Sequence, residues 1–118
     1  MIVIDLAEIP QARQGYGEQF ADDVLAYVLA HEVGHHVQAQ RGLLSQPEGD
    51  NVVRAELHAQ CLAGLYGHAT KRPLPPDWTY AADAVHGTVA QQKHWLELGH
   101  RTGRPAACDA VWDGELRP

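Results

Sequence analysis

The sequence predicts an α+β fold that is predominantly helical, with one short strand near its start. Three observations predict this class: apolar residues recur at helical spacing over residues 18–40, two further helical patterns cover 52–68 and 86–99, and a single β-branched run covers 2–6. The chain has 118 residues, which suits one hydrophobic core and is short for two. We therefore expect a single domain over residues 1–118.

Composition and charge narrow the classes of partner. Hydrophobic residues make up 45% of the chain and charged residues 20%, which is typical of a folded globular protein. The net charge is −6 and lysine and arginine form no run, so we expect no nucleic-acid partner. No apolar stretch approaches the roughly 20 residues of a bilayer span, and no signal peptide is recognisable. We expect a soluble protein, cytoplasmic rather than exported, with no membrane span in this chain.

The first expected element is the strand at residues 2–6, with the sequence IVIDL. Pro10 and Gly15 follow it, so the strand should end in a loop. A single strand needs a partner, because an open strand edge favours unwanted pairing. That partner is another segment of the domain, a second copy of the chain in a homodimer, or a bound peptide.

The first expected helix covers residues 18–40. Four apolar residues recur at the i, i+4, i+7 and i+8 spacing of one buried stripe: Phe20, Val24, Tyr27 and Val28. At about 100° per residue, His31 and His35 continue this stripe, whereas His36 points away from it. The imidazoles of His31 and His35 should therefore face the core or the floor of a cleft. Gly42 should end the helix.

A loop at residues 44–51 should lead into a second helix at 52–68. The narrow face of that helix carries small residues around one carboxylate: Val52, Glu56, Ala59, Ala63 and Gly67. Small side chains let two helices approach closely, so this face should contact the first helix.

A proline-rich connector follows at residues 71–77, and residues 78–85 should form a short helix. The third helix should begin after Thr88 as its N-cap and stop at Gly99. From Arg101 onwards the tail is expected to be a loop.

Two cysteines, Cys61 and Cys108, allow a single disulfide. Two cysteines alone do not establish an oxidising compartment. We therefore favour reduced thiols in the core.

The stretch HEVGH, residues 31–35, has the spacing of a zinc-binding helix. Histidines at i and i+4 stand one turn apart, so His31 and His35 can bind one Zn²⁺ ion, and Glu32 lies beside it as a base for metal-bound water. A catalytic zinc needs a third protein ligand. Gln38 and Arg41 stand where the metzincin pattern requires glycine and histidine, which excludes that class.

Glu56 is the candidate third ligand, because it is the only acidic residue within 52–68. The alternative for Glu56 is a solvated carboxylate or a partner of Arg54, and the alternative for His31 and His35 is a pair of hydrogen-bonded core histidines. Five further histidines are expected to be surface or packing residues: His36, His58, His68, His94 and His100.

With these residues in hand, the chain resembles the putative neutral zinc metallopeptidase family, a bacterial branch of the gluzincin-type zincins. Four stretches look like successive family blocks: HEVGHHVQ (31–38), RAELHAQCLAGLYG (54–67), HGTVAQQKHWLELG (86–99) and CDAV (108–111). The resemblance implies a minimal zincin-like metallopeptidase domain with an active-site helix, a glutamate-bearing second helix and a short edge strand that aligns a peptide or protein substrate.

The resemblance also implies roles for single residues. His31, His35 and Glu56 would be the zinc ligands, and Glu32 would be the general base in zinc-dependent hydrolysis of peptide bonds. His86, which opens the third block, would contact the substrate or the transition state, unless it serves only as a structural residue at a helix terminus.

Two departures from the family pattern bear on activity. Gluzincins carry an aspartate four residues after the third ligand, where this chain has Gln60. A glutamine oxygen can accept the N–H of the first histidine ligand but adds no negative charge, and loss of such a partner costs about 10–100-fold in metal affinity or activity. Family members also usually carry more sequence before the strand. The alternative function is therefore a zinc-binding module with little or no protease activity, in an accessory or regulatory role.

Overall fold

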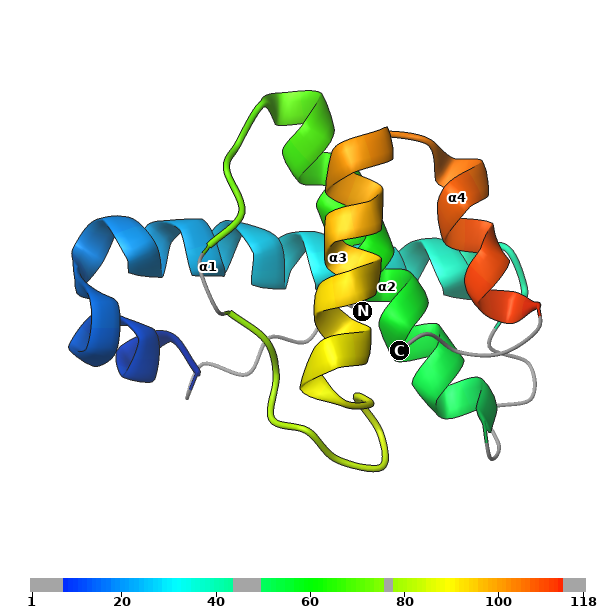
Figure 1. The fold of residues 1–118 in the computed structure, drawn as a ribbon, viewed down its shortest axis with the longest axis horizontal. Coiled ribbons are helices and arrows are strands. Elements are labelled where there is room, and N and C mark those ends of the chain that lie inside the picture. The colour runs from blue at the N-terminus through cyan, green and yellow to red at the C-terminus, as the bar shows by residue number, and fades with distance from the viewer. Residues whose placement is uncertain (1–7, 44–49, 76–77, 114–118) are drawn as a thin grey trace.

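The computed structural model describes the backbone of residues 8–43, 50–75 and 78–113. Its elements, in chain order, are α1 (Glu8–Gln40), α2 (Asp50–Thr70), α3 (Val89–Thr102), α4 (Pro105–Asp109) and the 3-10 helix η1 (Ala110–Trp112) (Figure 1). Within these ranges the only β structure is an isolated bridge between Asp83 and Gly87. The predominantly helical class is confirmed, and the strand predicted at residues 2–6 lies outside the described residues.

Helix α1 starts earlier than the sequence predicts. It begins at Glu8 rather than at residue 18, so the loop predicted through Pro10 and Gly15 is wrong. Proline is compatible with the first turn of a helix, because the N–H groups there have no acceptor within the helix. Figure 1 shows the first turns of α1, in dark blue, set at an angle to the rest of the helix.

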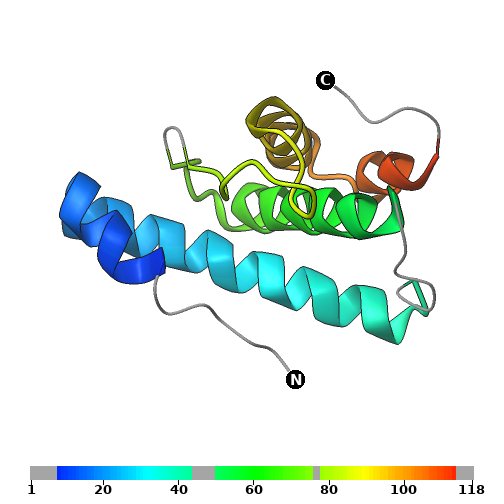
Figure 2. The ribbon, with the colours of Figure 1, turned by 90° about the horizontal axis from the view of Figure 1, so that it is seen from below.

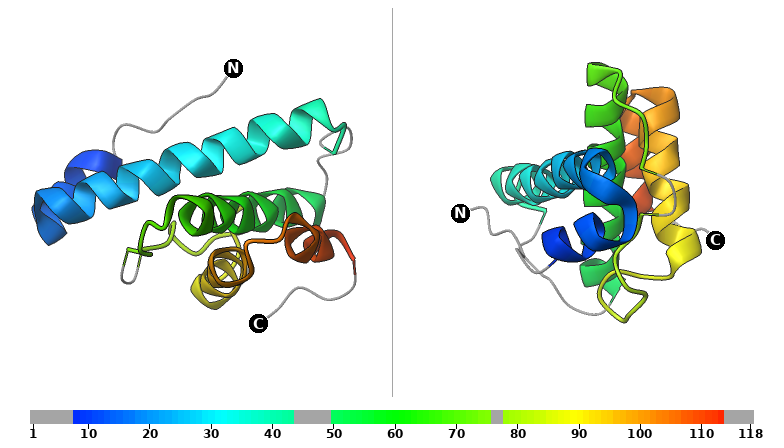
Figure 3. Two further views of the ribbon diagram at one scale, coloured as in Figure 1. Left: turned by 90° about the horizontal axis from the view of Figure 1, so that it is seen from above. Right: turned by 90° about the vertical axis from the view of Figure 1, so that its left-hand side faces the viewer.

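Helix α2 lies between α1 on one side and α3 with α4 on the other (Figure 2; Figure 3, left). The predicted small-residue face of α2 does contact α1: a Cβ atom added at Gly34 of α1 would lie 3.3 Å from Cα of Ala59. Further along, a Cβ atom at Gly67 would overlap the hydroxyl of Tyr27. This close approach brings the side chains of α1 within reach of those of α2.

Helix α3 packs equally closely on the other side of α2. Thr88 is its N-cap as predicted, and Thr88 and Gln91 form a reciprocal capping box. The predicted stop at Gly99 is wrong, because the helix continues to Thr102 and ends at Gly103, whose φ is 61°. Gly99 instead serves helix packing, since a Cβ atom there would overlap the carbonyl oxygen of Cys61.

The short helix predicted at residues 78–85 is wrong. Both polar backbone groups of Tyr80 are bound by the side chain of Gln92, which accepts from the N–H at 2.8 Å and donates to the carbonyl at 3.1 Å. The Asp83 carboxylate then closes a turn by accepting from the backbone N–H groups of Val85 and His86. These side-chain bonds replace the backbone bonds that a helix would need.

The described part of the tail, residues 101–113, is mostly helical rather than a loop, since it contains the end of α3, all of α4 and η1. A disulfide joins Cys61 of α2 to Cys108 of α4, with their Cα atoms 5.5 Å apart, so the expectation of reduced thiols is also wrong. Both cysteines are fully buried beside Leu57 and Val111. The sequence could not reveal this proximity, because it depends on how α4 folds back onto α2.

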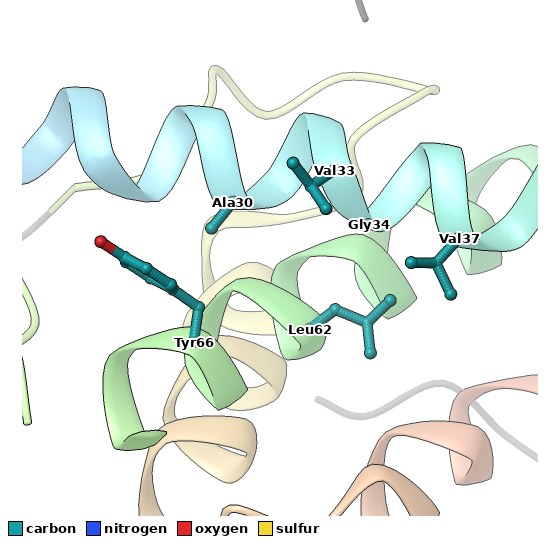
Figure 4. Close-up of a pocket in the computed structure, with 6 residues that line it drawn as sticks. All are labelled: Ala30, Val33, Gly34, Val37, Leu62 and Tyr66. Carbon is teal, nitrogen blue, oxygen red and sulfur yellow. The ribbon is translucent and has the colours of Figure 1, made fainter. Parts of the chain in front are cut away.

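An apolar pocket of about 270 Å³ lies between α1 and α2 (Figure 4). Six residues line it: Ala30, Val33, Gly34, Val37, Leu62 and Tyr66. Val33 and Val37 stand about 200° around α1 from His31 and His35, respectively, so the pocket lies on a different flank of the helix from the histidine pair. No helix in the described part of the chain is long and apolar enough to cross a membrane.

Candidate metal centre

Three side chains that the sequence singles out converge between α1 and α2. Nε2 of His31 lies 2.9 Å from Oε2 of Glu56, Nε2 of His35 lies 3.2 Å from the same oxygen, and the two nitrogens are 3.1 Å apart. Among the described residues, these three form the only group of histidine, cysteine and acidic side chains close enough to hold a metal ion.

The spacing of the three atoms suits a tetrahedral zinc site. Ligand atoms bound at 2.0–2.1 Å and at tetrahedral angles lie about 3.3 Å from one another. The three observed separations, 2.9, 3.1 and 3.2 Å, are close to that value. Two imidazole nitrogens and one carboxylate oxygen are also a donor set that catalytic zinc sites use. The residues present therefore fit a zinc ion.

The charge of the site is set by burial and by mutual contact. The side chain of His31 is 2% exposed, that of His35 24% and that of Glu56 18%. Burial alone would raise the pKa of Glu56, but hydrogen bonds with both histidines outweigh it and hold that pKa well below its usual range. Burial likewise lowers the pKa of His35, but the hydrogen bond and charge of Glu56 outweigh it, so this pKa is raised. The carboxylate is thus ionised, as a metal ligand must be.

Gln60 occupies the place that the sequence predicts for it. Its Oε1 atom lies 2.8 Å from Nδ1 of His31, and its side chain is 1% exposed. The amide oxygen accepts the ring N–H at Nδ1, so in a neutral His31 ring Nε2 is the nitrogen whose lone pair is available to a metal ion. The substitution of glutamine for aspartate therefore keeps the hydrogen bond and omits the charge.

Sequence reasoning missed the corresponding partner of His35. Oε1 of Gln38 lies 2.9 Å from Nδ1 of His35, and the Gln38 side chain is fully buried. The sequence points to Gln38 only as a residue that departs from the metzincin pattern. Its position three residues after His35, where helical side chains meet, is the signal that could have found it.

Glu32 follows the first histidine on α1 and is half-buried. Its negative charge is close enough to His35 to contribute to the raised pKa of that imidazole. Glu32 is not one of the three converging side chains. Glu32 thus lies close to the group without being part of it.

Two ring contacts connect His86 to the converging group. Its ring stacks on that of Tyr80 with centroids 4.8 Å apart, and the Tyr80 ring lies 4.9 Å from that of His31. Nδ1 of His86 is 3.0 Å from the Asp83 carboxylate. Sequence reasoning missed Tyr80 and Asp83, because the turn that presents them depends on Gln92.

The five other histidines singled out in the sequence are absent from the converging group. His58 is fully buried and contacts Gln38, while His68 and His100 contact backbone carbonyls in the loop and helix ends around residues 72 and 100. His36 is exposed, and the ring of His94 packs edge-on against that of Trp95. These contacts agree with the packing and surface roles that the sequence predicts.

Comparisons with known proteins point to one family. Residues 2–76 match the family described as putative neutral zinc metallopeptidase. YpfJ of Escherichia coli strain K12, an uncharacterized protein, is 29% identical over 144 residues, which cover 92% of this chain and 50% of YpfJ. Rv2575 of Mycobacterium tuberculosis, also uncharacterized, is 41% identical over 58 residues, which cover 44% of this chain and 19% of that protein. The chain thus spans half the length of YpfJ, and no solved structure matches it.

The matched range covers more than half of the chain and includes every residue of the converging group as well as Glu32. The resemblance drawn from the sequence motifs is thereby confirmed. The chain belongs to the putative neutral zinc metallopeptidase family.

Proposed function

We propose that this chain binds Zn²⁺ through His31, His35 and Glu56 and hydrolyses peptide bonds in a peptide or protein substrate. One observation carries the proposal: three metal-binding atoms from two helices converge at separations of 2.9–3.2 Å, beside a glutamate that is not among them. A ligand triad with an adjacent base is the constellation of a hydrolytic zinc site. The family description supports the same reaction class.

Glu32 acts as the general base. The zinc ion, when bound, supplies a Lewis acid for the scissile carbonyl and lowers the pKa of water towards about 7. Glu32 removes a proton from the attacking water as its oxygen bonds to the carbonyl carbon. When the C–N bond breaks, Glu32 returns this proton to the amine nitrogen, so the carboxylate is regenerated.

His86 is the candidate for contact with the developing oxyanion. The Asp83 carboxylate accepts from Nδ1 of His86 at 3.0 Å, which leaves Nε2 of the ring to donate elsewhere when the imidazole is protonated. The Asp83 contact and the stacking on Tyr80 fix the ring plane. Such a fixed donor stabilises negative charge that develops in the transition state.

The experiment pairs metal analysis with a protease assay. Zinc per chain is measured in protein purified without added metal, and cleavage of an unstructured protein is measured for wild type, Glu32→Gln and the control Glu97→Gln, an exposed glutamate on α3. We expect one zinc in all three and cleavage by wild type and Glu97→Gln only. Zinc in all three without cleavage would support the alternative, a zinc-binding module with an accessory role. Wild type without zinc would show the proposal to be wrong.

A further inference from the structure

One fully buried glutamine ties the second histidine of the pair to the helix that carries Glu56. Gln38 lies on α1, one turn after His35, and its side chain is 0% exposed. Oε1 of Gln38 lies 2.9 Å from Nδ1 of His35, while its Nε2 lies 2.8 Å from the carbonyl oxygen of Ala55 and 2.9 Å from Nδ1 of His58. One amide thus contacts three groups on two helices.

The Ala55 carbonyl fixes the orientation of this amide. A carbonyl oxygen can only accept a hydrogen bond, so the nitrogen of the Gln38 amide must face it. The amide oxygen then faces Nδ1 of His35, and because that oxygen can only accept, Nδ1 carries the ring proton. In a neutral His35 ring, Nε2 is therefore the nitrogen whose lone pair is available to a metal ion.

We propose that Gln38 is a positioning residue of the metal centre. By accepting from Nδ1 of His35 while donating to the Ala55 carbonyl, it sets the tautomer and ring orientation in which Nε2 of His35 binds the metal. This inference rests on the proposed zinc site. Because the Gln38 side chain is fully buried, water cannot replace its hydrogen bond with His35 when the amide is removed. Partners of this kind are worth about 10–100-fold in metal affinity.

The contacts continue outward to the C-terminal helix. The second N–H of the Gln38 amide points to Nδ1 of His58, so the proton of a neutral His58 is on Nε2. That nitrogen lies 3.5 Å from Oδ1 of Asp109 on α4, and Arg41 reaches the same oxygen at 3.5 Å. The neighbouring Cys108 anchors α4 through its disulfide. Asp109, the outermost residue of this series of contacts, therefore lies beyond residue 76, where the family match ends.

The test compares variants that keep or remove the acceptor at position 38. Gln38→Met has a similar volume but offers His35 only the weak acceptor of a thioether sulfur, whereas Gln38→Glu retains a carboxylate oxygen as acceptor. Tyr27→Phe is the matched control, because it removes a partly buried hydrogen bond of the same helix whose acceptor is the Arg72 carbonyl and not a group of the histidine pair. Zinc dissociation constants are measured by competition with a chelator. The exchange of the His35 Nδ1 proton is followed by NMR in the zinc-loaded proteins.

The expected result is a zinc dissociation constant raised about 10–100-fold in Gln38→Met, at least partly restored in Gln38→Glu and unchanged in Tyr27→Phe. The Nδ1 proton should exchange faster in Gln38→Met than in wild type. The inference is overturned if Gln38→Met binds zinc within threefold of wild type, if Gln38→Glu is no better, or if Tyr27→Phe is weakened as much. Wild type that binds no zinc would instead overturn the proposed function, and this inference with it.

Discussion

Nε2 of His31 lies 2.9 Å from Oε2 of Glu56, although the two residues are 25 positions apart and belong to different helices. The approach depends on small residues, since Gly34 of α1 packs directly against Ala59 of α2. A larger side chain at either position would separate the helices and move the carboxylate away from the imidazoles. The convergence of these side chains is thus a consequence of how closely α1 and α2 pack.

Zinc should stabilise the fold, because it binds groups that only the folded chain brings together. A free zinc concentration 100-fold above the dissociation constant adds roughly 2.7 kcal/mol to the free energy of unfolding. A chelator should therefore lower the Tm of wild type and of the exposed variant Glu97→Gln, but affect Glu56→Gln much less. An equal response of all three proteins in thermal unfolding would contradict the ligand assignment.

Replacing Gln60 by glutamate should tighten zinc binding. Oε1 of Gln60 already accepts from His31 at 2.8 Å, and its amide nitrogen has no hydrogen-bond partner among the described residues. Gln60→Glu keeps the acceptor and adds the negative charge that increases ligand basicity. We expect a lower zinc dissociation constant by chelator competition. The metal-free protein should be less stable than wild type by at least about 1–3 kcal/mol, because the new charge is buried. Unchanged or weaker zinc binding would show that charge at this position is not limiting.

Tyr27 should make the protein sensitive to alkali. Its hydroxyl donates to the Arg72 carbonyl at 2.8 Å, and burial raises the pKa of Tyr27 from 10.0 to about 12. The unfolded chain loses this proton first, so the stabilising contribution is complete below pH 10 and is lost as the pH rises through about 12.

Urea unfolding at several pH values tests the role of Tyr27. Tyr27→Phe should be about 1 kcal/mol less stable than wild type at neutral pH and should lose less stability in alkali. Parallel pH profiles for the two proteins would rule out Tyr27 as the source of the alkaline sensitivity.

The disulfide should contribute measurably to stability. It links α2 to α4 across 47 residues, and such bonds typically add about 2–4 kcal/mol to the free energy of unfolding. A reductant should lower the urea midpoint of wild type to that of the double variant Cys61→Ser, Cys108→Ser. The same reductant should leave the double variant unchanged. Identical midpoints for oxidised and reduced wild type would contradict the prediction.

Much of the fold could be predicted from local patterns. The spacing of Val24, Tyr27 and Val28 located the buried face of α1, and Thr88 located the start of α3 through a bond to a residue three positions away. The errors arose where a distant side chain decided the backbone. Gln92 holds Tyr80 outside any helix, and Gly99 is a packing residue because α2 lies against it.

For the candidate metal centre, local sequence patterns were sufficient to name the residues, because two histidines one turn apart must share a face of any helix. The sequence also identified Glu56 and Gln60. Helix packing, by contrast, brings His31, His35 and Glu56 within 3.2 Å of one another. It also places Gln38 against the ring of His35, and Tyr80 and His86 beside the group. The two kinds of information differ because helical periodicity fixes only the direction of a side chain relative to the axis of its own helix. The distance between side chains on different helices is set by packing, which no local pattern encodes.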